Sequence, residues 1–149
     1  MRISMMAVLA AAGLGLAACP GAVSDEARQA GEANRAALDA CFQAAGFITG
    51  QTSPAPADGG NRRGPGGDAW NDGSLQAADG TWLDLYHWSE WADDPNHARE
   101  AAAYQVGVFN EQAYAGYGPA RAVGSRAYVP VGTSAAYENA DLDACLAMP

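Results

Sequence analysis

The stretch Thr-Trp-Leu-Asp-Leu-Tyr-His-Trp, residues 81–88, carries the strongest strand signal in the chain. It is rich in aromatic and branched residues, which favour strands, and it follows Asp79-Gly80, a pair typical of a turn. Because side chains alternate between the two faces of a strand, one face carries Trp82, Asp84, Tyr86 and Trp88. We therefore expect residues 81–88 to form a principal strand of a sheet.

The sequence after this strand predicts a helix, a hairpin and a short helix. Asp93-Asp94-Pro95 supplies an N-cap and a proline at the first helical position, and a helical period continues to about Ala115. Residues 120–123 and 126–131 flank Gly124-Ser125, whose leading glycine suits a type II′ turn. Residues 138–148 favour a short closing helix that carries Leu142, Cys145 and Leu146 on one side.

Before the strand, the sequence predicts a helix from Asp25 to Ala45 with Ser24 as its N-cap. Its last two turns carry an apolar stripe, formed by Leu38, Cys41, Phe42 and Ala45. Gly46 is placed to end the helix as the left-handed residue of a Schellman motif, with Phe47 folded back on Phe42.

Composition changes sharply between Gly50 and Gly73, where seven glycines and three prolines occupy 24 positions. Such a proportion is typical of low-complexity sequence, so we expect a flexible surface loop over residues 50–73.

Together these elements predict one α+β domain over residues 24–149. Its core is a small sheet of about three strands in βαββ order, flanked by the N- and C-terminal helices. A two-layer packing, with the helices over one face of the sheet, is the simplest way to bury each apolar stripe.

The N-terminus has the layout of an export signal. Arg2 precedes a short apolar stretch over residues 3–16, and small residues then lead into Cys19. The stretch is shorter than the roughly 20 apolar residues that cross a bilayer, and Pro20-Gly21 closes it. The sequence Leu16-Ala17-Ala18-Cys19 resembles the lipobox of bacterial lipoproteins. Ordinary secretion, with cleavage near Ala17 or Ala22, and an uncleaved anchor are the alternatives.

The resemblance implies that residues 1–18 are a signal peptide and that Cys19 carries lipid, with residues 19–23 as a tether. It places the chain in the bacterial cell envelope, anchored to the inner or outer membrane, with its domain facing the periplasm or the exterior. Two or more acyl chains make such attachment long-lived. The resemblance covers only the first twenty residues or so.

If Cys19 carries lipid, two of the three cysteines remain, Cys41 and Cys145. An even pair in a compartment that permits disulfides predicts a bond between them. The loop that it closes contains about 100 residues, for which the chain-entropy model gives roughly 4 to 5 kcal/mol. Two buried free thiols are the alternative, because cysteine also behaves as a small core hydrophobe.

Charge excludes several classes of partner and chemistry. The formal net charge is −9, which repels phosphate backbones and argues against nucleic-acid binding. All eight basic residues are arginines, so Schiff-base chemistry and a P-loop lysine are excluded.

No catalytic motif stands out, and we expect neither enzyme activity nor a cofactor. A metal site can be imagined from His87, His97 and the acidic residues between them, Glu90, Asp93 and Asp94. The two histidines are expected on a strand edge and in the first turn of a helix, positions that need not converge, so no metal site is predicted.

The sequence therefore predicts a lipid-anchored envelope protein whose domain is non-catalytic and serves in structure or in interaction with another envelope protein. The alternative is a ligand-binding module for a sugar or a peptide, with an aromatic face formed by Trp82, Tyr86, Trp88 and Trp91. The same residues can instead pack into a small core, an arrangement that needs no ligand.

Overall fold

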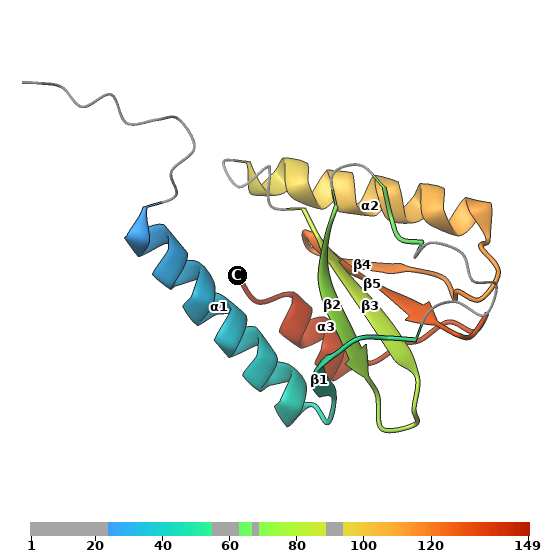
Figure 1. Ribbon diagram of the computed structural model, residues 1–149. Helices are drawn as coiled ribbons and strands as arrows, with labels where there is room; N and C mark the ends of the chain where they lie inside the picture. Colours follow the sequence, from blue (N-terminus) through green and yellow to red (C-terminus); the bar gives the residue numbers. More distant parts are fainter. Residues whose placement is uncertain (1–23, 55–62, 67–68, 89–93) are drawn as a thin grey trace, which may run out of the picture.

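The computed structural model describes residues 24–54, 63–66, 69–88 and 94–149. The lipobox with Cys19, the signal and tether segments and Trp91 lie outside these residues. Within them, three helices accompany a five-stranded antiparallel sheet of order β1-β2-β3-β5-β4 (Figure 1). The elements are α1 (Asp25–Ala44), β1 (Ile48–Gln51), β2 (Trp70–Gln76), β3 (Trp82–His87), α2 (Pro95–Gln112), β4 (Arg121–Val123), β5 (Arg126–Val131) and α3 (Ala140–Leu146).

The strand expected over residues 81–88 is the central one. β3 pairs with β2 on one side and with β5 on the other. The turn into β3 is the expected one, since Gly80 has a φ of +87° and the Asp79 carboxylate accepts a hydrogen bond from the Thr81 N–H. Gly124 has a φ of +61°, the value that a type II′ turn requires at its first central position.

Helices cover both faces of the sheet, so the predicted two-layer packing is wrong. Beneath α2, one core cluster joins Ala102, Val106 and Phe109 to the even-numbered residues of β3. A second cluster, on the other face, joins Leu83 and Leu85 to residues of α1 and α3. β3 is apolar on both faces, and a sheet of that kind needs a cover on each.

The sheet also has five strands where about three were expected. Both additional strands come from the ends of the stretch predicted as a loop, since Gly50 lies in β1 and Gly73 in β2. The general class, in which helices accompany a sheet, is as predicted, and the sheet is antiparallel.

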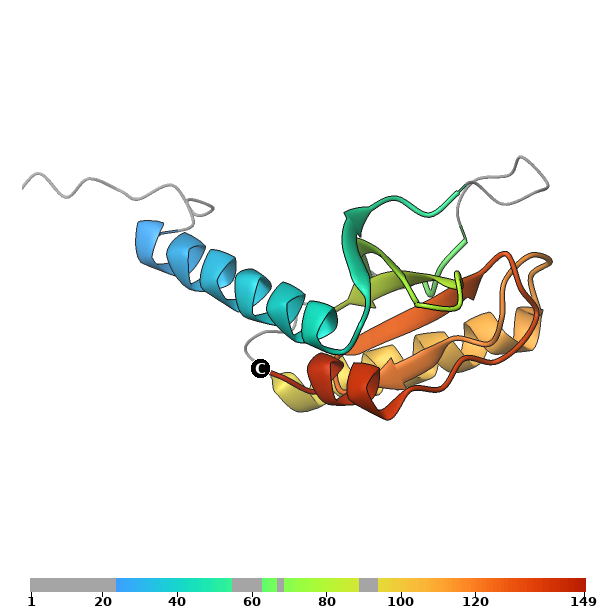
Figure 2. The ribbon, with the colours of Figure 1, turned by 90° about the horizontal axis from the view of Figure 1, so that it is seen from below.

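The first helix begins and ends as the sequence predicts. The Ser24 hydroxyl accepts a hydrogen bond from the Ala27 N–H. At the other end, the Phe47 N–H donates to the Phe42 carbonyl and the Gly46 N–H to the Gln43 carbonyl, the two bonds of a Schellman motif. Only the last turns of α1 pack on the sheet. Residues 24–37 are exposed, and this half of the helix extends away from the rest of the molecule (Figure 2).

The second helix ends at Gln112, about three residues before the expected end. Ala113 turns left-handed, with a φ of +45°. The Asn110 side chain then bonds the backbone of Ala120 in both directions, donating to its carbonyl and accepting from its N–H. These two bonds hold the following chain beside the helix, which accounts for the early end.

Cys41 of α1 and Cys145 of α3 form a disulfide with a Cα–Cα distance of 5.7 Å. The apolar sides predicted for the two helices face each other here, because Cys145, Leu142 and Leu146 are buried in the cluster that receives Phe42. The bond joins the first helix to the last, as the cysteine count predicted.

Candidate functional site

The aromatic face of β3 belongs largely to the core. Tyr86 is 7% exposed and Trp88 is 2% exposed, and both pack beneath α2, with Trp82 partly buried against the same cluster. The three side chains share a face as predicted. However, α2 covers that face, so Tyr86 and Trp88 present no open ring to a ligand. Their burial argues against the ligand face expected at these two residues.

Asp84 lies on the same face and is fully buried. Its Oδ1 accepts hydrogen bonds of 2.6 Å from the hydroxyls of Ser53 and Ser74. Charge-assisted hydrogen bonds of this kind offset the cost of removing a carboxylate from water. Asp84 thereby fastens the segment that follows β1 to the centre of the sheet.

An open cleft lies on the opposite face, between α1 and the sheet. Its volume is about 400 Å³, which falls in the range of small-molecule sites. The residues that line it come from four elements: Gly31, Asn34, Arg35, Leu38, Asp39 and Phe42 of α1, Trp70, Asn71 and Asp72 of β2, Leu85 and His87 of β3, and Arg126 of β5. A second hollow of about 230 Å³ shares Arg35, Asp39, Asp72 and Leu85 with it and extends toward β1. We call the larger hollow the α1 cleft.

Three side chains form a row across the sheet in this cleft. Trp70 pairs with His87 in the β2–β3 register, and His87 pairs with Arg126 in the β3–β5 register. Neighbouring strands lie about 4.8 Å apart, so the row extends over roughly 10 Å. Trp70 is 54% exposed, which makes it the most open of the described tryptophans. The row thus places an aromatic ring, an imidazole and a guanidinium side by side.

A β-bulge in the wall of the cleft lies at Asp72. The β2–β3 register shifts between Asn71 and Gly73, which leaves Asp72 without a cross-strand partner. Continued from the pairs Trp70–His87 and Asn71–Tyr86, the register would place Asp72 opposite Leu85, so Asp72 lies on the cleft face together with Trp70. Gly73, with a φ of +105°, and the Asn71 side chain, which accepts a hydrogen bond from its N–H, hold the bulge in shape.

Asp72 contacts two basic groups of the cleft. Its Oδ2 lies 2.7 Å from the Nδ1 atom of His87, and its Oδ1 lies 3.9 Å from the Arg35 guanidinium. The Asp72 and His87 atoms are close, but their geometry is not that of a well-directed hydrogen bond. Nδ1 is buried against Asp72, while the His87 side chain as a whole is partly exposed.

Arg126 contacts backbone carbonyls. Its Nη1 donates to the carbonyls of Leu146 and Met148 at the end of α3. Within the described residues no carboxylate pairs with it, whereas Arg121 contacts Asp143 and Glu138. Arg126 therefore brings to the α1 cleft a guanidinium that no described carboxylate pairs with, in a lining that holds two arginines and two aspartates.

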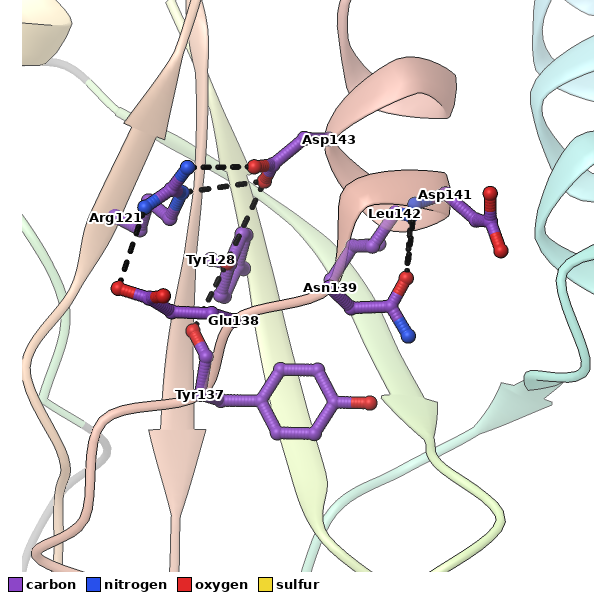
Figure 3. Close-up of polar contacts among 8 residues, drawn as sticks. All are labelled: Arg121, Tyr128, Tyr137, Glu138, Asn139, Asp141, Leu142 and Asp143. Carbon is purple, nitrogen blue, oxygen red and sulfur yellow. Dashed lines mark hydrogen bonds and ion pairs between the residues drawn. The ribbon is translucent and has the colours of Figure 1, made fainter.

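A second polar cluster, around Arg121, is structural (Figure 3). The guanidinium of Arg121 donates to both carboxylate oxygens of Asp143, at 3.3 and 2.7 Å, which joins β4 to α3. Beside it, the Tyr128 hydroxyl donates to the Tyr137 carbonyl at 3.0 Å. Burial, together with the Asp143 carboxylate, raises the pKa of Tyr128 well above its usual value. The contacts of the cluster are made among its own residues.

The two histidines do not converge. His87 faces the α1 cleft, whereas His97 lies in the first turn of α2, on the other side of the sheet. Glu90 and Asp93 lie outside the described residues. Among the residues that the structure does describe, no group of three or more histidine, cysteine and acidic side chains is placed to hold a metal ion.

Compared with known proteins, the chain matches no family model, no curated protein and no solved structure.

Sequence reasoning did not find the α1 cleft. Its residues are separated by up to about 95 positions and meet only through the pairing of β2, β3 and β5. One signal was available, since Asn71-Asp72-Gly73 is a sequence that favours irregular backbone and His87 stands on the strand already predicted.

Proposed function

We propose that this chain is a lipid-anchored protein of the bacterial cell envelope, and that residues 24–149 form a non-catalytic domain that binds a small polar ligand in the α1 cleft. Attachment is through Cys19, to the inner or the outer membrane, with the domain facing the periplasm or the exterior. The observation that carries the binding role is the α1 cleft with its exposed Trp70.

Two features support the envelope location. The lipobox-like sequence at residues 16–19 indicates export and attachment to a membrane. The disulfide between Cys41 and Cys145 is of the kind that persists in oxidising compartments. In the described part of the chain, no helix combines the length and apolarity needed to cross a bilayer.

The composition of the cleft supports binding. Small-molecule sites combine apolar or aromatic walls with a few convergent polar groups. Here Leu38, Phe42 and Leu85 supply apolar wall, and the polar groups are two amides, two guanidinium groups, one imidazole and two carboxylates. We therefore place ligand binding in the α1 cleft and not on the aromatic face of β3, which α2 covers.

Intact-mass measurement of the mature protein from a bacterial host tests the anchoring. We expect a chain that begins at Cys19 with the added mass of acyl groups, and we expect the Cys19→Ala variant to leave the membrane fraction. A Cys19→Ala chain that is processed and still sediments with membranes would refute the lipoprotein proposal.

Fluorescence of the full chain in detergent tests the cleft, with soluble cell-wall glycan fragments as the probe. We expect tryptophan emission to change on binding and the change to disappear in Trp70→Phe. Tyr104→Phe is the matched control, because Tyr104 is 69% exposed on α2, away from the cleft. An emission change that survives in Trp70→Phe would place the binding elsewhere.

A further inference from the structure

We infer that the ligand of the α1 cleft is a sugar acid: a saccharide ring that carries a carboxylate. The inference rests on the proposed binding function and names its ligand class. Its basis is the row formed by Trp70, His87 and Arg126, together with the amides that line the cleft beside that row.

Arg126 and His87 supply the site for the carboxylate. A guanidinium binds a carboxylate through two parallel hydrogen bonds, which need two of its nitrogen atoms. Within the described residues, the protein contacts of Arg126 use Nη1 alone, so Nε and Nη2 are available. The neighbouring His87 lines the cleft beside Arg126, with its Nδ1 against Asp72. The guanidinium of Arg126, which pairs with no described carboxylate, is the group of the cleft that suits an anion.

Trp70 supplies the site for the ring. It stands at the other end of the row, roughly two strand spacings from Arg126. That span accommodates one ring on the indole and an acidic substituent at the guanidinium. An exposed tryptophan offers a large apolar platform at low cost in side-chain entropy, which suits the apolar face of a saccharide ring.

The remaining polar groups favour a saccharide over an aromatic acid. Asn34 and Asp39 line the cleft from α1, and Asn71 lines it from the start of β2. An amide offers both donors and an acceptor, so these groups match the hydroxyls of a sugar. An aromatic acid has no hydroxyls to offer these groups, so it would gain no hydrogen bonds from them.

Isothermal titration of the full chain in detergent with four compounds tests the assignment. D-glucuronate is the sugar acid, D-glucose lacks the carboxylate, acetate lacks the ring and benzoate replaces the saccharide with an aromatic ring. We expect D-glucuronate to bind at least about tenfold more tightly than each of the others, which corresponds to roughly 1.4 kcal/mol.

Two variants test the residues. Trp70→Ala is expected to weaken D-glucuronate binding about tenfold, and Arg126→Gln is expected to weaken it by at least as much without changing the affinity for D-glucose. The glutamine amide at this position can still donate to the end of α3, which protects the fold. Tyr104→Ala and Arg99→Gln, on α2, are the matched controls and should change neither affinity.

Each contrary result has one meaning. Binding of D-glucose as tight as that of D-glucuronate overturns the carboxylate site, and acetate binding as tight overturns the ring site. Tighter binding of benzoate replaces the sugar acid with an aromatic acid. If cell-wall glycan fragments bind at Trp70 while D-glucuronate does not, the ligand class fails and the binding function stands; if nothing perturbs Trp70, both fail.

Discussion

Single residues at the centre of the sheet set much of the chemistry of this domain, and Tyr128 is the clearest case. Its ring is buried in the cluster beneath α1 and α3, while its hydroxyl reaches the Tyr137 carbonyl and lies 3.4 Å from Asp143. Burial and the nearby carboxylate both disfavour the phenolate, so the pKa of Tyr128 is raised. The folded protein therefore keeps this proton at a pH where the unfolded chain has lost it.

Stability should fall as the pH rises above about 10, the ordinary pKa of a tyrosine, since the unfolded chain then gains by releasing the proton. The Tyr128→Phe variant should lose about 1 kcal/mol near neutral pH, because its hydrogen bond to Tyr137 is gone. It should also show a shallower alkaline decline. Urea unfolding of both proteins at a series of pH values measures these changes.

Tyr104→Phe is the control, because the exposed Tyr104 should alter neither the free energy of unfolding nor its alkaline decline. The free energy of unfolding could instead decline equally for the wild type and for Tyr128→Phe above pH 10. That result would show that another group, such as Tyr137, governs the loss of stability at alkaline pH.

At the scale of elements, the ending of α1 depends on a backbone conformation that favours glycine. Gly46 has a φ of +86°, and no atom lies near the position that a Cβ would take. Any loss of stability when another residue replaces Gly46 therefore comes from backbone strain and not from a steric clash. Gly107, inside α2, also has open space but an ordinary helical backbone.

The two glycines should therefore respond oppositely to alanine. Gly46→Ala should destabilise the protein by about 1 kcal/mol, and Gly107→Ala should stabilise it by up to about 1 kcal/mol. Thermal unfolding of the two variants beside the wild type tests this difference. A stabilising Gly46→Ala would mean that the Schellman ending is not maintained in solution.

The elements that the sequence predicted are those with local signals. α1 has a capping serine and a terminal glycine, and the β4–β5 hairpin has Gly124 at its turn. β1 and β2 have no such signal. β2 contains Asn71-Asp72-Gly73, residues depleted in strands, and it is a strand only because β3 pairs with it along its length. Pairing partners distant in sequence cannot be read from a local pattern.

Two-sided burial of β3 was visible in the sequence but misjudged. Leu83 and Leu85 alternate with Trp82, Tyr86 and Trp88, so both faces of the strand are apolar. This pattern indicates a cover on each side, and the two-layer prediction gave weight to one face only.

For the whole molecule, the disulfide is the main covalent constraint. It joins positions 104 residues apart, and the chain-entropy model gives a stabilisation of roughly 4 to 5 kcal/mol for a loop of that length. The Cys41→Ser, Cys145→Ser double variant should lose most of this. Denaturant unfolding with and without a reductant measures the loss, since the reductant should lower the stability of the wild type and leave the double variant unchanged. Equal stability of the wild type in both conditions would contradict a constraining role.

The position of the disulfide also determines how the protein responds to a pulling force. Residues 42–144 lie inside the covalent loop, so tension between the two ends of the chain passes along α1, crosses the bridge and leaves through the last few residues. All five strands are outside that path. Under a steady pull, the first turns of α1 yield while the sheet stays whole, and the α1 cleft loses the wall that carries Asn34 and Arg35 before it loses Trp70, His87 and Arg126.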